Sequence, residues 1–147
     1  MAVLLVLLTV AAGVFLPLQV GMNSRLAHFV GGPVRASFVS FAVGSAILLV
    51  IVLIAYRGGS GVHRAANAPW WAWLGGAIGA FYVVSAVVVG PRLGATTFFG
   101  ILVATQLLMS VVVDRYGWLG FARHTPTPGR LVGVALLVSG ALLVRIF

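Results

Sequence analysis

Five long apolar runs alternate with short polar or Gly- and Pro-rich stretches along this 147-residue chain. A helix needs about 20 mostly apolar residues to cross a bilayer. The pattern therefore predicts five transmembrane helices, at approximately 2–26, 34–56, 70–89, 95–113 and 129–147. Because five is odd, the two termini are expected on opposite sides of the membrane. We expect the helices to form a single transmembrane domain over 1–147.

The composition indicates an all-α integral membrane protein. Hydrophobic residues make up 62% of the chain, charged residues only 7%, and the mean hydropathy is +1.20. A soluble domain carries roughly 25% charged residues, so this chain could not cover a surface that faces water. Its net charge of +8 comes from arginines scattered between apolar runs, which is not the clustered pattern of a nucleic-acid-binding surface.

The arginines are almost evenly divided between the two sides of the predicted membrane protein. Five fall on the side of the N-terminus and four on the other: Arg57, Arg64, Arg115, Arg123 and Arg130 against Arg25, Arg35, Arg92 and Arg145. An excess of basic residues normally sets one orientation. With almost no excess, we expect the chain to insert both ways, so that two copies form an antiparallel homodimer of ten helices. Such inverted pairs are the architecture of many transporters.

The first apolar run holds an unusual polar stretch, P-L-Q-V-G-M-N at 17–23. Pro17 lacks a backbone N–H and predicts a helix break. Gln19 and Asn23 are four residues apart and share one helical face. Polar groups at such depth are costly unless something binds them. They either form one wall of a substrate site or hold helices together, and Asn23 could instead cap or pair near the helix end.

Gln106 in the fourth run is the second amide at mid-depth. From the helical rise, Gln106 lies ~3 Å, Gln19 ~5 Å and Asn23 ~10 Å from the middle of its helix. Transporter sites lie near the midplane, so these three residues are the predicted substrate-binding set. In the alternative interpretation, the glutamines bond to each other or to a backbone carbonyl freed by Pro17.

Small residues at helical spacing predict where helices approach closely. The predicted packing residues occur in three helices, and they are Ser40 and Gly44, Gly75 and Gly79, and Gly129 and Gly133. A phosphate-binding loop is not indicated, because no strand precedes these glycines and no Lys follows. No set of residues has the spacing of a metal site or a catalytic triad, so we expect neither a metal, a cofactor nor an enzyme.

Asp114 is the only acidic residue in the chain. Acids inside a membrane are functional by default, which would make Asp114 a coupling residue. It lies near the end of the fourth run, however, and this depth favours an interfacial ion pair with an arginine.

Several motifs resemble those of the YdcZ-type transporters. They are P-L-Q-V-G-M-N-S-R-L-A with the following G-G-P, P-W-W-A-W-L-G-G-A-I-G-A at 69–80, G-P-R-L-G-A at 90–95, T-Q-L-L-M-S-V-V-V-D-R-Y-G at 105–117 and the closing G-V-A-L-L-V-S-G-A-L-L-V. This half-size branch of the drug/metabolite transporter superfamily is related to EamA-type and small multidrug resistance transporters. The resemblance implies five spans, assembly from opposed halves and a bacterial inner (plasma) membrane location.

Two departures limit what the resemblance implies. Thr105 stands where members commonly have glycine before the glutamine, which could narrow the site around Gln106. The chain also lacks the glutamate that small multidrug resistance transporters carry in their first helix. We therefore expect a transporter or facilitator of a small polar metabolite, working by alternating access in the antiparallel dimer. A non-transporting assembly subunit and an exporter of small cations or drugs are the alternatives.

Overall fold

The computed structural model describes residues 1–55, 65 and 67–147. The chain has five helices long and apolar enough to cross a membrane, as predicted, and the described residues contain no strand. They divide into two compact units, Met1–Arg92 and Leu93–Phe147. Arg57 and Arg64, which were counted on the N-terminal side of the membrane, lie in the connection between the second and third predicted helices and outside the described residues.

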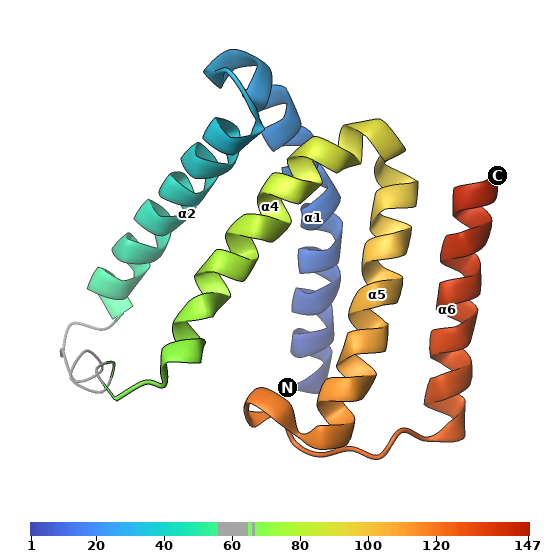
Figure 1. Ribbon diagram of the computed structural model, residues 1–147. Coiled ribbons are helices and arrows are strands. Elements are labelled where there is room, and N and C mark those ends of the chain that lie inside the picture. The colour runs from blue at the N-terminus through green and yellow to red at the C-terminus, as the bar shows by residue number, and fades with distance from the viewer. Residues whose placement is uncertain (56–64, 66) are drawn as a thin grey trace. The chain divides into compact units, whose positions relative to one another are not determined.

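The first unit contains helices α1 (Ala2–Val30), α2 (Pro33–Ala55) and α4 (Leu74–Leu93), with the 3-10 turn η1 (Trp70–Trp73) before α4 (Figure 1). Gly31 ends α1 in the left-handed region at φ 80°, where glycine has no Cβ penalty. The Gly32 N–H donates to the Ala27 carbonyl at 2.8 Å, and Pro33 opens α2, where its missing N–H costs nothing. A two-residue turn thus joins α1 to α2.

Helix α1 continues through Pro17 without interruption, so the expected helix break at this residue is wrong. Proline removes one backbone hydrogen bond, but unwinding would expose further backbone groups to hydrocarbon, where nothing replaces their partners. The helix also runs on to Val30, beyond the predicted end near Leu26, because Gly31 is the first residue to leave helical backbone angles.

Helix α4 likewise passes through a proline. The G-P-R-L-G stretch at 90–94 reads as a tight turn, yet α4 includes Pro91 and ends only at Leu93. Gly94, at φ 81°, is the single residue between α4 and the next helix. A side chain at this φ would be strained, which accounts for glycine at position 94.

The second unit contains α5 (Ala95–Tyr116), the 3-10 turn η2 (Trp118–Gly120) and α6 (Pro128–Ile146). Helices α5 and α6 lie side by side, and a methyl group on Gly100 would lie 3.8 Å from the Ala141 Cα. Two small residues thus bring the backbones together, as in other membrane helix pairs. The Thr127 hydroxyl caps α6 by accepting from the Arg130 N–H at 3.4 Å.

The predicted packing residues behave differently from one another. A methyl group on Gly79 would meet the Phe41 ring at 3.7 Å, which is a close contact between α4 and α2. At the other four glycines of the set, a methyl group would meet nothing within 4 Å: Gly44, Gly75, Gly129 and Gly133. Among these five glycines, packing is therefore found only at Gly79, because no other described helix of the same unit approaches the remaining four within 4 Å.

Candidate functional site

A cavity of about 220 Å³ lies within the first unit, and we call it the mid-membrane cavity. Its lining comes from α1, α2 and α4 and consists of Gln19, Ser40, Phe41, Gly44, Ser45, Leu48 and Val83. The structure thus places Gln19, predicted as a site residue, beside Ser40 and Gly44, predicted as packing residues. Glycine at 44 leaves the space on the α2 side open.

The mid-membrane cavity lies near the middle of all three helices. Gly44 is the central residue of α2. Gln19 is three residues past Leu16, the centre of α1, which corresponds to ~4.5 Å along the axis. Val83 is close to the centre of the span Trp70–Leu93. The cavity therefore lies at the middle depth of these three spans, with Ser40 half-buried and Gln19 and Ser45 exposed.

The polar groups of the mid-membrane cavity have no hydrogen-bond partner within the described residues. Neither the Gln19 amide nor the Ser40 and Ser45 hydroxyls form a side-chain hydrogen bond there. Other hydroxyls in these helices do, since Thr9 donates to the Leu5 carbonyl at 2.9 Å and Ser37 to the Pro33 carbonyl at 2.9 Å. Such back-bonding is the usual fate of Ser and Thr in membrane helices. Gln19, Ser40 and Ser45 are free to bind a ligand.

Asn23 lies one turn beyond Gln19 on the same face of α1, and only 6% of it is exposed. Its Nδ2 group has no hydrogen-bond partner in the part of the chain that the structure describes. An unsatisfied buried donor costs about 1–3 kcal/mol. The cap or pair considered from the sequence is not formed here, so this amide can donate to a ligand or to a group from outside the described chain.

Helices α1 and α4 cross at Val20 and Gly90. Both residues are buried, and a methyl group on Gly90 would lie only 3.1 Å from the Val20 Cγ1 atom. Glycine is needed at 90 for this approach. Ala86 and Val87, on the adjacent turn of α4, are 0% and 4% exposed. Val20, Ala86, Val87 and Gly90 thus form a small buried cluster where the two helices cross.

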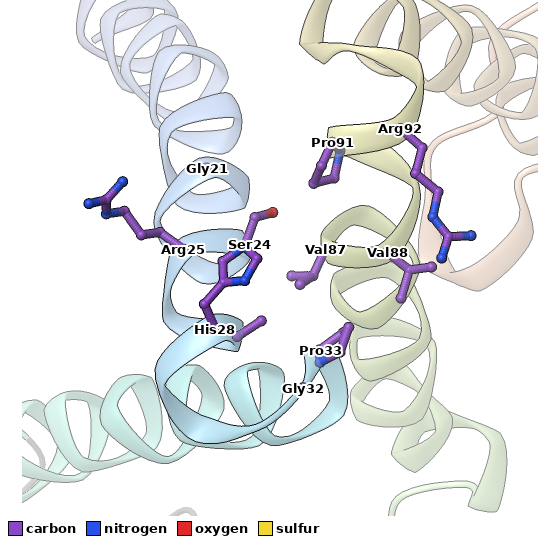
Figure 2. A pocket seen from close by; sticks show the side chains of 11 residues that line it. Gly21, Ser24, Arg25, His28, Gly32, Pro33, Val87, Val88, Pro91 and Arg92 are labelled. Atoms are coloured by element: carbon purple, nitrogen blue, oxygen red, sulfur yellow. The ribbon is translucent and has the colours of Figure 1, made fainter.

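A second cavity of about 610 Å³, which we call the end cavity, lies between the C-terminal halves of α1 and α4 (Figure 2). It is lined by Gly21, Ser24, Arg25, Ala27, His28, Gly32, Pro33, Val87, Val88, Pro91 and Arg92. In Figure 2, the side chains of Ser24 and His28 point into the space between the helices, whereas the guanidinium groups of Arg25 and Arg92 point outward from its rim.

Gln106 belongs to the second unit and is exposed on α5. The neighbouring Thr105 hydroxyl back-bonds to its own helix, donating to the carbonyls of Ile101 and Leu102 at 3.0 and 2.9 Å. Thr105 therefore uses its donor locally and adds bulk rather than a free hydroxyl. That Gln106 contributes to the substrate site stays a prediction.

Asp114 lies at the end of α5, with its Oδ2 atom 3.7 Å from Arg130 Nη1. The two side chains are 37% and 55% exposed, and an exposed pair of this kind contributes about 0–1 kcal/mol. The Asp114 backbone carbonyl also accepts the His124 N–H at 2.8 Å, which holds the loop before α6. This geometry matches the interfacial ion pair and not a mid-depth proton carrier.

The sequence-based interpretation missed Ser45 as a lining residue and assigned Ser40 and Gly44 to packing. The available signal was the phase of α2, because Ser40, Gly44 and Ser45 lie on one face at the depth of Gln19. Within the described residues, no three His, Asp or Glu side chains lie close enough together to hold a metal ion.

Residues 4–143 match the family described as "Putative inner membrane exporter, YdcZ". The chain belongs to the YdcZ family. It is also 29% identical to the Inner membrane protein YdcZ of Escherichia coli (strain K12), over 136 residues that cover 92% of this chain and 90% of that protein. No solved structure matches the chain. The resemblance seen in the motifs is confirmed across nearly the full length.

Membership in the YdcZ family agrees with the five apolar helices and identifies a multi-pass inner membrane protein with a transporter role. The family is a branch of the drug/metabolite transporters, as expected from the sequence. The mid-membrane cavity, with its free amide and hydroxyls, is therefore the candidate substrate site of a YdcZ-family transporter.

Proposed function

We propose that this protein is a secondary transporter or facilitator that carries a small neutral or zwitterionic metabolite through the mid-membrane cavity. The observation that carries the proposal is the group formed by Gln19, Ser40 and Ser45, which lines this cavity without internal hydrogen bonds. An amide offers two donors and an acceptor, and each hydroxyl adds a donor and an acceptor. Such groups bind polar but uncharged parts of a ligand.

The charge of the first unit disfavours a cation exporter. Residues 1–92 include no Asp or Glu, so no carboxylate from this unit can balance a cation in the mid-membrane cavity. An unpaired charge at that depth is costly. A neutral or zwitterionic ligand avoids most of this cost, which is why we favour that class.

Alternating access would use the α1–α4 crossing as one of its barriers. Val20 and Gly90 are in close contact, and the chain neighbours of Val20, Gln19 and Gly21, line the mid-membrane cavity and the end cavity, respectively. In the proposed cycle, α1 and α4 separate at this contact to connect the two cavities, and Asn23 becomes accessible to the passing substrate.

The antiparallel homodimer remains part of the proposal. It is supported by the near-equal arginine counts on the two sides, and by Gly75, Gly129 and Gly133, which meet no other described helix of their own unit. The most apolar windows of α2 and α6 also contain no buried residue. A second copy in the opposite orientation would cover these faces and complete an inverted pair.

The proposal is tested by flux into proteoliposomes, using a panel of small neutral and zwitterionic metabolites. Gln19→Leu should abolish uptake of any transported compound, because it removes the amide without shortening the side chain greatly. Thr9→Val is the matched control on the same helix, since Thr9 bonds only to its own backbone, and it should transport like the wild type.

Assembly is measured in the same preparations by size-exclusion chromatography. Loss of flux with normal assembly supports the substrate site. Unchanged flux in Gln19→Leu with poor assembly would instead identify Gln19 as an assembly residue. The assigned substrate class would be contradicted if the wild-type protein transported organic cations into liposomes but transported no neutral or zwitterionic compound.

A further inference from the structure

We propose that the end cavity binds an anionic group, a phosphate or a carboxylate, at the membrane surface. This assignment is separate from the transported metabolite and concerns a different cavity. It rests on the charge of the lining, on the free guanidinium groups at the rim and on the depth of the cavity.

The end of the first unit that holds this cavity is exclusively basic. Arg25, His28 and Arg92 line the cavity, and Arg35 lies at the first turn of α2 beside it. Asp114, the only acid of the chain, belongs to the other unit. A cleft lined by charges of one sign with apolar walls concentrates the field and attracts the opposite ion.

The two rim arginines are available for a ligand. Neither Arg25 nor Arg92 forms a side-chain hydrogen bond or an ion pair within the described residues, and both are exposed. Arg35 differs, because its Nη1 group donates to the Val30 carbonyl at 3.5 Å. The guanidinium groups, which point outward in Figure 2, have no partner among the described residues that holds them there, and in the proposed complex they turn toward the bound anion.

The end cavity lies at the ends of the spans α1 and α4, which in a membrane helix are near the lipid headgroups. Arg92 is the penultimate residue of α4 and His28 is in the last turn of α1, and the turn Gly31–Gly32 closes the same end. Basic pockets between helices at this depth bind anionic headgroups. A phosphate could thus come from a lipid headgroup or from a soluble anion, and the two sources share the same chemistry.

The experiment uses the full chain in nanodiscs. Inorganic phosphate is titrated into protein in phosphatidylcholine nanodiscs by calorimetry, and retention of phosphatidylglycerol from mixed nanodiscs is measured by native mass spectrometry. Arg25→Gln and Arg92→Gln should each weaken binding about tenfold, the value of one charge-assisted hydrogen bond. Arg145→Gln, which removes an arginine near a helix end outside the cavity lining, should bind like the wild type.

Phosphate binding in neutral nanodiscs assigns the site to a soluble anion, and retention of phosphatidylglycerol alone assigns it to a lipid headgroup. The proposal is overturned if the wild type binds neither probe saturably, or if Arg145→Gln weakens binding as much as the rim variants do. Increasing NaCl should also weaken phosphate binding by the wild type. This measurement uses the wild type alone, so it tests the proposal even where a variant fails to fold. No flux is measured, so the result is independent of the transport proposal.

Discussion

Val20 on α1 and Gly90 on α4 are in tight contact where these two helices cross. A methyl group on Gly90 would lie 3.1 Å from the Val20 Cγ1 atom, which is tighter than ordinary van der Waals contact. The contact is adjacent to both cavities, since Gln19 lines the mid-membrane cavity and Gly21 and Pro91 line the end cavity. The size of the side chain at position 90 should therefore affect the stability of the first unit. In the proposed transport cycle it should also affect the barrier between the two cavities.

Gly90→Ala should destabilise the protein by about 1–3 kcal/mol, the usual cost of overpacking. Thermal unfolding in detergent measures the effect. Gly76→Ala on the same helix is the control, since a methyl group there meets nothing within 4 Å, and it should not destabilise. The double variant Val20→Ala with Gly90→Ala should recover most of the loss, and failure to recover it would show that the added methyl group strains something other than Val20.

Asn23→Leu should raise stability while lowering transport. The change removes a buried amide whose Nδ2 group has no partner among the described residues, which relieves a penalty of about 1–3 kcal/mol. The unfolding temperature and the flux of the same preparation are compared. A lower unfolding temperature would mean that the amide has a partner in the native assembly.

Asp114→Asn should have little effect on either property. The pair with Arg130 is separated by 3.7 Å and is substantially exposed, so its loss is expected to cost no more than about 1 kcal/mol. Flux is measured with and without a pH gradient. Transport that depends on the gradient in the wild type but not in Asp114→Asn would make Asp114 a coupling residue after all.

The antiparallel arrangement makes a topological prediction that this chain is well suited to test, because it has no cysteine. A single cysteine at Phe147 should be labelled by an impermeant reagent from each side of the membrane in roughly half of the molecules, as expected for a chain without a charge bias. Labelling from one side only would rule out the dual orientation.

Gly133→Leu should weaken the dimer and leave the chain folded. A methyl group on Gly133 would meet nothing within 4 Å in its own unit, so a larger side chain should leave the α5–α6 pair intact and, in the proposed dimer, disturb the face that the second copy covers. Cross-linking in native membranes measures dimer content, and circular dichroism checks the helices. Gly100→Leu is the contrasting variant, since Gly100 packs against Ala141 within the chain and its replacement should destabilise the fold itself.

The five spans could be predicted from the sequence because crossing a bilayer depends on local properties, namely hydropathy and backbone hydrogen bonds satisfied within each segment. The same locality identified the amides at mid-depth and the interfacial position of Asp114. Helix ends were harder to predict, since Pro17 and Pro91 read as interruptions while the hydrocarbon environment favours continuous helices across both.

Which helix faces meet was decided only by tertiary structure. The helices are apolar on almost every side, so their periodicity does not distinguish a face toward lipid from a face toward protein. Ser40 and Gly44 therefore read as a packing stripe, and only the fold placed them around a cavity with Gln19. Glycines with the same spacing differ in whether they pack against another helix, because such a contact needs a surface from a distant segment. Gly79 contacts Phe41, whereas Gly75 contacts no other described helix of the first unit.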